Sequence, residues 1–253
     1  MHAEPVKGEW RSWTWGEVWN VSFNFAKSLV ALGASHRSAV NIIGYNSPFW
    51  IWAFYGTILA DNIAVGVYTT NTPGACQYVA DHSSAEVIMA ENETQMYKYL
   101  DILHQLPKLK AIIVWSINRF PQKPNKIVYG WEEFLELGNK ETGLPQSCED
   151  IVLERIENQV PGKCCNIVYT SGTTGNPKGV MLTHDNQYFV YTQMLKNAED
   201  EKVQLGKERI VSYLPLSHSA AQLNDILANL IGRFQIYFAR PDALQDSLVG
   251  KFI

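Results

Sequence analysis

Charge of either sign is scarce in this sequence. Its 253 residues include 21 Lys and Arg against 25 Asp and Glu, so charged residues make up 18% and the formal net charge is −4. A protein that collects nucleic acid or an anionic membrane needs a strong basic field, and the composition supplies none. The sequence therefore predicts no nucleic-acid partner and at most peripheral contact with a membrane.

Cysteine is also rare. The four cysteines form no Cys-x-x-Cys pair, and two of them are adjacent in an apolar run, where a strand would point them to opposite faces. We predict buried free thiols in a reducing compartment, in preference to a disulfide or metal role, for Cys76, Cys148, Cys164 and Cys165. The six histidines include no His-Glu-x-x-His pair, which argues against a zinc hydrolase.

Long hydrophobic runs are missing as well. The longest, Phe49–Ala60, spans about a dozen residues and falls short of the roughly 20 needed to cross a bilayer, so a buried helix is expected there. The N-terminal stretch MHAEPVKGEWRSWTW has the pattern of neither a signal peptide nor a transit peptide. We expect a cytoplasmic protein, with at most peripheral attachment to intracellular membranes such as the endoplasmic reticulum.

What the sequence does contain is a steady alternation of helical and extended patterns. Their periods predict helices at Thr14–Leu32, Phe49–Ala60, Gly74–Asp81, Glu93–Leu106, Trp131–Leu137, Asp150–Asn158, Asp185–Lys196 and His218–Ile231. They predict strands at Ala39–Tyr45, Ile63–Thr70, Glu86–Ala90, Ala111–Trp115, Cys165–Thr170, Gly179–Thr183, Ile210–Leu214 and Gln235–Ala239. The alternation indicates an α/β fold with a doubly wound, mostly parallel sheet and helices on both faces.

One segment, Tyr169–Val180 (YTSGTTGNPKGV), has the composition of a phosphate-binding loop. Because an extended apolar run lies on each side of it, the loop is expected to join two strands of a hairpin. The P-loop of kinases and GTPases, G-x-x-x-x-G-K-[ST], does not match: counted from Gly172, Pro177 stands where the second glycine belongs, and Gly179 follows the lysine. An ordinary P-loop nucleoside triphosphatase is therefore disfavoured.

The loop nevertheless carries several groups suited to an anion. Glycines at 172, 175 and 179 allow positive φ angles and a close approach of backbone N–H groups, and Lys178 adds a mobile positive charge next to the stiff Pro177. Hydroxyl groups are supplied by Thr170, Ser171, Thr173 and Thr174. The alternative is a solvated hairpin turn, since glycine, asparagine and proline are common turn residues.

The whole segment resembles the phosphate-binding signature of adenylate-forming enzymes, which include acyl-CoA synthetases, luciferases and peptide-synthetase adenylation domains. Further pieces make the chain similar to the bubblegum type of long-chain acyl-CoA synthetase from about Trp10 to Val249: YNSPFW, YTTNTPGACQYV, GVMLTHDN, VSYLPLSHSAAQ and FARPDALQDSLV. The resemblance implies that residues 1–253 form part of the large N-terminal, AMP-binding domain. It further implies a ligase that uses ATP with Mg²⁺ to convert a fatty acid to an acyl-adenylate and then transfers the acyl group to coenzyme A.

The resemblance also assigns roles to residues. The β and γ phosphates would be held by Thr170, Ser171, Gly172, Thr173, Thr174, Gly175, Asn176, Pro177 and Lys178, with Thr173 and Thr174 near the metal. Lys178 would act in catalysis, and His218 would place a neutral imidazole near the substrate carboxylate. An alternative for His218 is a residue in the first turn of a helix whose N-cap is Ser217. The segment from Thr183 to Asn186 is interpreted as a helix-capping turn, and Tyr129–Glu133 (YGWEE) as a helix start.

Parts of the family pattern are not found in these residues. Downstream of the loop the sequence contains no Tyr-Gly-x-Thr-Glu segment for adenine and no counterpart of the C-terminal lid, and its pattern changes to GKFI after Val249. We therefore expect a fragment, shortened at both ends, that alone binds ATP poorly and turns over negligibly. The alternative is a non-catalytic truncated isoform that acts as a binding or regulatory partner.

Overall fold

A computed structural model describes residues 1–6, 9–170, 175–199 and 204–240 of the chain. Its larger sheet has seven strands in the order β7-β6-β5-β3-β4-β8-β9. Their bounds are β3 Ala39–Ile43, β4 Ile63–Val67, β5 Ala85–Ala90, β6 Ala111–Val114, β7 Val128–Gly130, β8 Cys164–Thr170 and β9 Lys178–Thr183. Neighbouring strands are parallel except β8 and β9, which pair antiparallel. The expected mostly parallel sheet and its terminal hairpin are confirmed.

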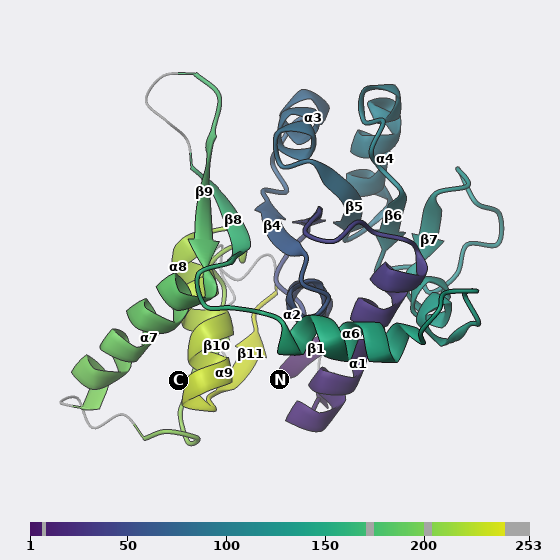
Figure 1. The fold of residues 1–253 in the computed structure, drawn as a ribbon. Helices are drawn as coiled ribbons and strands as arrows, with labels where there is room; N and C mark the ends of the chain where they lie inside the picture. Colours follow the sequence, from purple (N-terminus) through teal and green to yellow (C-terminus); the bar gives the residue numbers. More distant parts are fainter. Residues whose placement is uncertain (7–8, 171–174, 200–203, 241–253) are drawn as a thin grey trace.

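Helices cover both faces of this sheet. On one face, α1 (Trp15–Ala31), α2 (Pro48–Leu59), α5 (Trp131–Leu135) and α6 (Cys148–Glu157) pack over the alternate residues Val40 and Ile42 of β3. On the other, α3 (Pro73–His82) and α4 (Glu93–Asp101) pack over Ile43, Val65 and Ile88. Because successive side chains of a strand point to opposite faces, each buried strand serves two cores. The doubly wound arrangement is thereby confirmed (Figure 1).

Local signals explain where the first three helices begin. Thr14 caps α1 in a capping box in which its hydroxyl accepts from the N–H of Glu17, while the Glu17 carboxylate accepts from the N–H of Thr14. Ser47 and Thr72 cap α2 and α3 through their hydroxyls alone, which accept from the N–H of Trp50 and of Ala75, and a proline occupies the first helical position of each. These caps lie at the carboxyl ends of the preceding strands and so fix where the chain turns back across the sheet.

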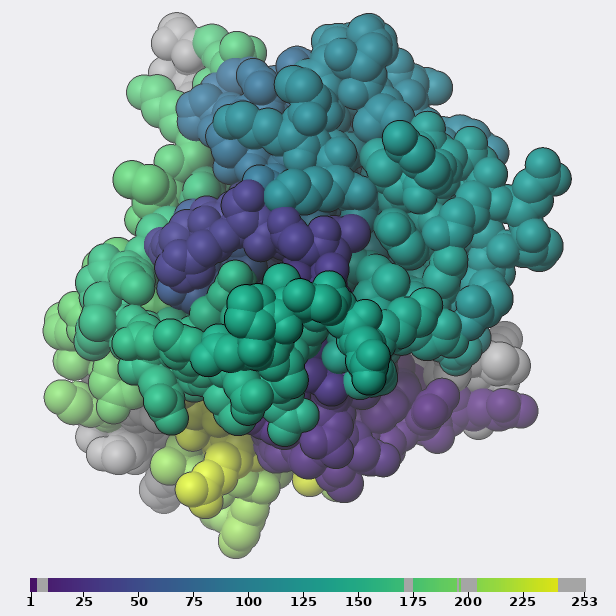
Figure 2. All heavy atoms as spheres, turned by 45° about the vertical axis from the view of Figure 1, so that its right-hand side comes forward, coloured from purple at the N-terminus to yellow at the C-terminus, as the bar shows by residue number. Residues whose placement is uncertain are grey.

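A second, four-stranded sheet corrects the prediction of a single one. Its order is β10-β11-β1-β2, with β1 His2–Val6, β2 Glu9–Ser12, β10 Arg209–Ser212 and β11 Gln235–Phe238. The sequence analysis assigned no strand before the first helix. Pairing here depends on residues far apart in sequence, since His2 lies opposite Tyr237. Figure 2 shows the purple N-terminal segment beside the yellow C-terminal segment on the lower side of the molecule.

The helices near the end of the described chain differ from the expected ones in detail. After α7 (His184–Glu199), the predicted continuous helix His218–Ile231 is divided into α8 (Ser219–Ala221), a π-helical segment (Gln222–Leu227) and α9 (Ala228–Gly232). The predicted helix Glu93–Leu106 ends at Asp101 and is followed by a short 3-10 turn. Within the described ranges, no helix combines the length and apolar character required to span a membrane.

Candidate functional site

The β8–β9 hairpin brings the two ends of the glycine-rich loop together. Thr170, the last residue of β8, lies directly opposite Lys178, the first residue of β9, and both are exposed. The side chain of Lys178 forms no hydrogen bond or ion pair with any residue that the structure describes, which leaves its ammonium group available to an anion. The hairpin projects from the large sheet (Figure 1). A polyanion held by the loop would therefore meet a hydroxyl and a positive charge at its entrance.

The remaining predicted phosphate ligands fall into two groups. Ser171, Gly172, Thr173 and Thr174 lie outside the described residues, and with them both positions predicted near the metal. Gly175 and Asn176 are exposed and Pro177 is half-buried at the start of the second arm. Gly175 has φ +88°, the left-handed region that favours glycine. Gly179 does not have a positive φ angle. Its lack of a side chain permits close packing instead, since a Cβ there would lie 3.0 Å from Ile167 Cγ2.

His218 lies in the turn between β10 and α8, and it is exposed. The alternative interpretation, in which Ser217 caps the helix, is wrong, because the N-cap of α8 is His218 itself. Its Nδ1 accepts a 3.1 Å hydrogen bond from the N–H of Ala220. A neutral imidazole whose Nδ1 accepts carries its proton on Nε2, so His218 can donate from Nε2. No hydrogen bond joins His218 to Thr170 or Lys178 in the described part of the chain.

A network of side-chain amides fixes the turn that carries His218. Asn46 donates to the carbonyl of Leu214 (2.6 Å) and accepts from the N–H of Leu216 (3.0 Å). Gln222 donates to the carbonyl of Leu216 (2.9 Å) and accepts from Asn166 in β8. The sequence pieces YNSPFW and LPLSHSAAQ therefore meet in space. Sequence reasoning recognised both pieces but missed that the amide of Asn46 bonds to the backbone of the second.

A buried acid supports the same region. The Ser212 hydroxyl accepts from the Asn46 amide (2.9 Å) and donates to a carboxylate oxygen of Asp225 (2.7 Å). Asp225 belongs to the π-helical segment and is only 5% exposed. Burial raises its pKa to about 6, although the hydrogen bond from Ser212 acts in the opposite direction. The turn before α8 is thus connected to a group that titrates near neutral pH.

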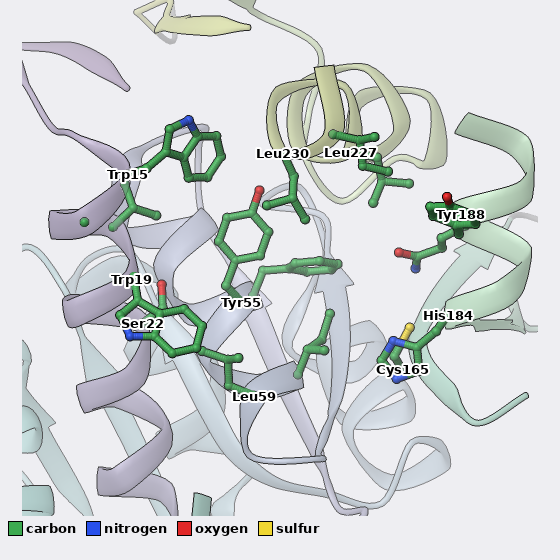
Figure 3. A pocket seen from close by; sticks show the side chains of 16 residues that line it. Trp15, Trp19, Ser22, Tyr55, Leu59, Cys165, His184, Tyr188, Leu227 and Leu230 are labelled. Atoms are coloured by element: carbon green, nitrogen blue, oxygen red, sulfur yellow. The ribbon is translucent and has the colours of Figure 1, made fainter. Parts of the chain in front are cut away.

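A large apolar cavity of about 740 Å³ lies among the helices α1, α2, α7 and α9. Figure 3 shows Trp15 and Trp19 of α1 on one side of it and Tyr188 of α7 on the other. Apolar side chains make up most of the wall: Trp15, Val18, Trp19, Phe54, Tyr55, Ile58, Leu59, Tyr188, Leu227, Leu230 and Ile231. Its volume falls in the range of small-molecule pockets. The sequence analysis missed this cavity, for which the aromatic residues four positions apart in the first helix were the available signal.

A few polar groups also line the cavity: Ser22, Cys165, His184 and Gln187. Burial lowers the pKa of His184, with the charges of Arg37 and Lys163 adding to that effect and Asp61 opposing it. Burial also raises the pKa of the Cys165 thiol to about 12, so this thiol stays protonated and is no nucleophile. Because Thr170 lies five positions beyond Cys165 in the extended strand, the cavity and the loop entrance lie about 16 Å apart along β8.

Other sequence interpretations can be checked directly. Thr183 and Asn186 exchange two hydrogen bonds of 3.1 Å at the start of α7, which confirms a capping turn. Gly130 precedes α5 and its N–H donates to Glu133, which confirms a helix start. All four cysteines are unpaired, and three are buried as predicted whereas Cys164 is half-buried. Within the described ranges, no three acidic, histidine or cysteine side chains are placed to hold a metal ion.

Comparison with known proteins extends these observations. The family model described as AMP-binding enzyme matches residues 2–252. The long-chain-fatty-acid–CoA ligase ACSBG2 of Gallus gallus is 42% identical over 248 residues, covering 98% of this chain and 32% of the relative. ACSBG1 of Homo sapiens, of the same description, is 41% identical over 244 residues, covering 96% of this chain and 32% of the relative. The chain thus spans about a third of the length of these relatives.

Solved structures share the fold. O-succinylbenzoate coenzyme A synthetase from Bacillus subtilis, in complex with AMP, matches with a TM-score of 0.65 at 18% identity, over 90% of this chain and 50% of that one. ATP-bound MatB from Rhodopseudomonas palustris matches with a TM-score of 0.69 at 16% identity, over 98% of this chain and 44% of that one. At such identities the likeness concerns the fold alone.

Proposed function

The chain belongs to the AMP-binding enzyme family, and from that premise we propose that it supplies the phosphate-binding part of a long-chain fatty acid–CoA ligase. The observation that carries the proposal is the pairing of Thr170 with Lys178 across a loop whose Gly175 has a positive φ. Relatives about 40% identical over nearly the whole chain have this activity in their names. The proposed substrates are a fatty acid, ATP accompanied by Mg²⁺, and coenzyme A.

In the proposed first step, a fatty acid carboxylate attacks the α-phosphorus of ATP and pyrophosphate leaves as the acyl-adenylate forms. Negative charge grows on the leaving oxygens, and the ammonium group of Lys178 would stabilise it. The Nε2–H of His218 would donate to an oxygen of the reacting carboxylate. The acyl group then passes to the thiol of coenzyme A, which displaces AMP.

The preference for a long chain would reside in the apolar cavity. Its wall of aliphatic and aromatic side chains suits a hydrocarbon tail, because burying apolar surface stabilises by about 25 cal/mol per Å². A tail whose carboxylate lies near the loop entrance would have to extend along β8 to reach Leu227 and Cys165. Long acyl chains can bridge such a distance and short ones cannot.

An exchange assay tests the proposal. Labelled pyrophosphate exchanges into ATP only when a fatty acid is adenylated, so the assay reports this half-reaction without coenzyme A. We would place residues 10–249 in the Gallus gallus relative, in exchange for the matching segment, and measure exchange by the chimera and its Lys178→Ala variant. We expect fatty-acid-dependent exchange that falls about 100-fold in the variant. The matched control Lys126→Ala, an exposed lysine whose side chain forms no hydrogen bond or ion pair among the described residues, should keep full exchange.

The 253-residue chain is assayed in parallel. Phosphate contacts at an exposed loop are worth about 1 kcal/mol each, and no residues that match the family's adenine motif accompany them here. We therefore expect weak ATP binding and no exchange from the chain alone. Exchange that persists in the Lys178→Ala chimera would refute the role of the lysine. A folded chimera without any exchange would favour the non-catalytic alternative.

We further propose that the protein resides in the cytoplasm, with at most peripheral contact with intracellular membranes. The four unpaired cysteines, three of them buried, support a reducing compartment. Fractionation of cells that express the tagged protein tests this, and recovery in a lumenal fraction would contradict it.

A further inference from the structure

The second arm of the glycine-rich loop has few restraints of its own. Among the described residues, β9 is the last strand of the large sheet and pairs only with β8. Pro177 and Lys178 stand at its very beginning, where a strand frays most readily. A lysine that must meet a particular phosphate oxygen needs a fixed backbone, because small displacements of a catalytic group cost rate. A contact from outside the hairpin would therefore matter here.

One such contact comes from α3. The hydroxyl of Tyr78 donates a 3.0 Å hydrogen bond to the carbonyl oxygen of Pro177. This carbonyl belongs to the peptide group that links Pro177 to Lys178, so the bond holds the plane of the peptide from which Lys178 begins. The proline ring fixes the φ angle on the other side of the same carbonyl. The backbone at Lys178 is thus held by α3 as well as by β8.

Tyr78 is itself held in place by two aromatic neighbours. Its ring stacks on His82, one turn further along α3, with centroids 5.4 Å apart, and meets the edge of Tyr169 at 6.4 Å. His82 Nδ1 and the Tyr169 hydroxyl share a hydrogen bond of 2.8 Å. Tyr169 belongs to β8 and is paired with Gly179, where a Cβ would lie 3.3 Å from its ring. The cluster therefore locks α3 to both arms of the hairpin.

From this geometry we infer that Tyr78 is a positioning residue for Lys178, acting through its hydrogen bond to Pro177. The inference rests on the proposed function for its catalytic meaning, whereas the tether itself is a property of the chain without any ligand. Tyr78 does not touch the reacting atoms. It sets the position of the Lys178 backbone. The ligand whose binding depends on that position would be a phosphate-bearing nucleotide.

Hydrogen–deuterium exchange of the 253-residue chain tests the tether without ATP. In Tyr78→Phe, which removes only the hydroxyl, amides of residues 175–180 should exchange about threefold to tenfold faster, as expected for one lost hydrogen bond. Amides of β3 and β5 should be unchanged, which also verifies the fold. The matched control is Tyr97→Phe on α4, whose side chain is 50% exposed. Unchanged exchange at 175–180 in Tyr78→Phe, or equal acceleration in the control, would overturn the inference.

A kinetic measurement in the chimera tests the consequence for the nucleotide. Tyr78→Phe should raise KM for ATP about threefold to tenfold and leave KM for the fatty acid unchanged, a split that general destabilisation would not produce. Equal changes in both KM values would overturn the positioning role. If the unmodified chimera lacks activity, the ligase proposal fails while the hydrogen exchange result still decides whether the tether exists.

Discussion

Gly66 of β4 packs against Ser217 so closely that a Cβ on the glycine would lie 2.7 Å from the Cα of Ser217. The buried strand thereby sets the position of the turn that leads into His218. Because the nearest atom belongs to the backbone, no rotation of a side chain can relieve the overlap.

Gly66→Ala should therefore displace this turn and destabilise the fold by about 2 kcal/mol, the typical cost of overpacking. Urea unfolding measures the free energy, and the NMR resonances of the His218 ring report the displacement. The matched control is Gly74→Ala in α3, where a Cβ meets no atom within 4 Å. Equal stability of the two variants would show that the turn adapts without cost.

The raised pKa of Asp225 predicts a pH dependence of stability. Its pKa of about 6 in the folded state exceeds the ordinary value of 3.8, so the folded protein binds the proton more tightly. The stabilisation of the folded state that results from this proton binding is present below about pH 4 and is lost as the pH rises through 6. Asp225→Asn, which can still accept from Ser212, should thus be more stable than the parent at pH 8 by up to about 3 kcal/mol.

Chemical unfolding of both proteins between pH 4 and pH 8 measures this difference. Ser212→Ala provides a second comparison, since it removes the hydrogen bond but keeps the buried carboxyl group. A difference between Asp225→Asn and the parent that does not vary with pH would contradict the assignment.

Asp61 shows the opposite behaviour. Burial alone would raise its pKa, but hydrogen bonds from His36 and Arg37, with the charges of Arg37 and Lys163, outweigh burial and lower it below 3.8. Its stabilising contribution is present above that value and is lost as the pH falls through the lowered pKa. At pH 7, Asp61→Asn should cost about 2 kcal/mol, because it weakens the charge-assisted hydrogen bond from the partly exposed Arg37 to a buried carboxylate.

Thermal and urea unfolding at pH 7 and pH 3 test this expectation. The loss should shrink at pH 3, which lies below the ordinary pKa of 3.8, because the unfolded parent protonates Asp61 there. Asp101→Asn, an exposed aspartate at the end of α4, is the matched control and should be neutral. An Asp61→Asn variant as stable as the parent at pH 7 would show that the charge of Asp61 contributes nothing to the free energy of unfolding.

The apolar cavity predicts a change in chain-length preference. In the chimera, Leu227→Trp should fill part of the cavity and lower kcat/KM for the longest fatty acids while sparing shorter ones. Each methylene of the fatty acid that is excluded from the cavity forfeits about 0.8 kcal/mol of burial free energy, which lowers kcat/KM roughly fourfold. The control is Leu153→Trp on the exposed side of α6. An unaltered order of preference would exclude this cavity as the acyl site.

The fold was largely predictable because its signals are local. The buried strands β3, β5 and β6 appear in the sequence as short apolar runs, and the helices α1 to α4 each start at a hydroxyl or amide cap. The hairpin followed from extended patterns on both sides of the loop. Elements whose stability depends on distant partners could not be found in this manner. β1 contains a proline and few apolar residues, and it forms a strand because β11 lies beside it.

The candidate site divides in the same way. The glycines, hydroxyls and lysine of the loop are contiguous in sequence, so composition identified them. The residues that hold the site in place are distant in sequence from the segments they bond to. Asn46 bonds to a turn that follows it by 168 residues, and Tyr78 bonds to Pro177, which follows it by 99 residues. Neither side chain differs in type from an ordinary surface residue. The cap of α8 was misplaced by one residue, because a histidine that accepts at Nδ1 can replace the serine that is more common at this position.

The pairing of His2 with Tyr237 also bears on the order in which the chain acquires its structure. Apart from the β4–β8 pair, the large sheet joins strands that are near one another in sequence and can assemble while synthesis continues. The small sheet cannot, since its β1–β2 hairpin is synthesised more than 200 residues before β11, the strand that pairs with β1. Contacts at such separations form slowly. During that interval the β1–β2 hairpin exposes an unpaired edge, which leaves it open to non-native pairing in the growing chain.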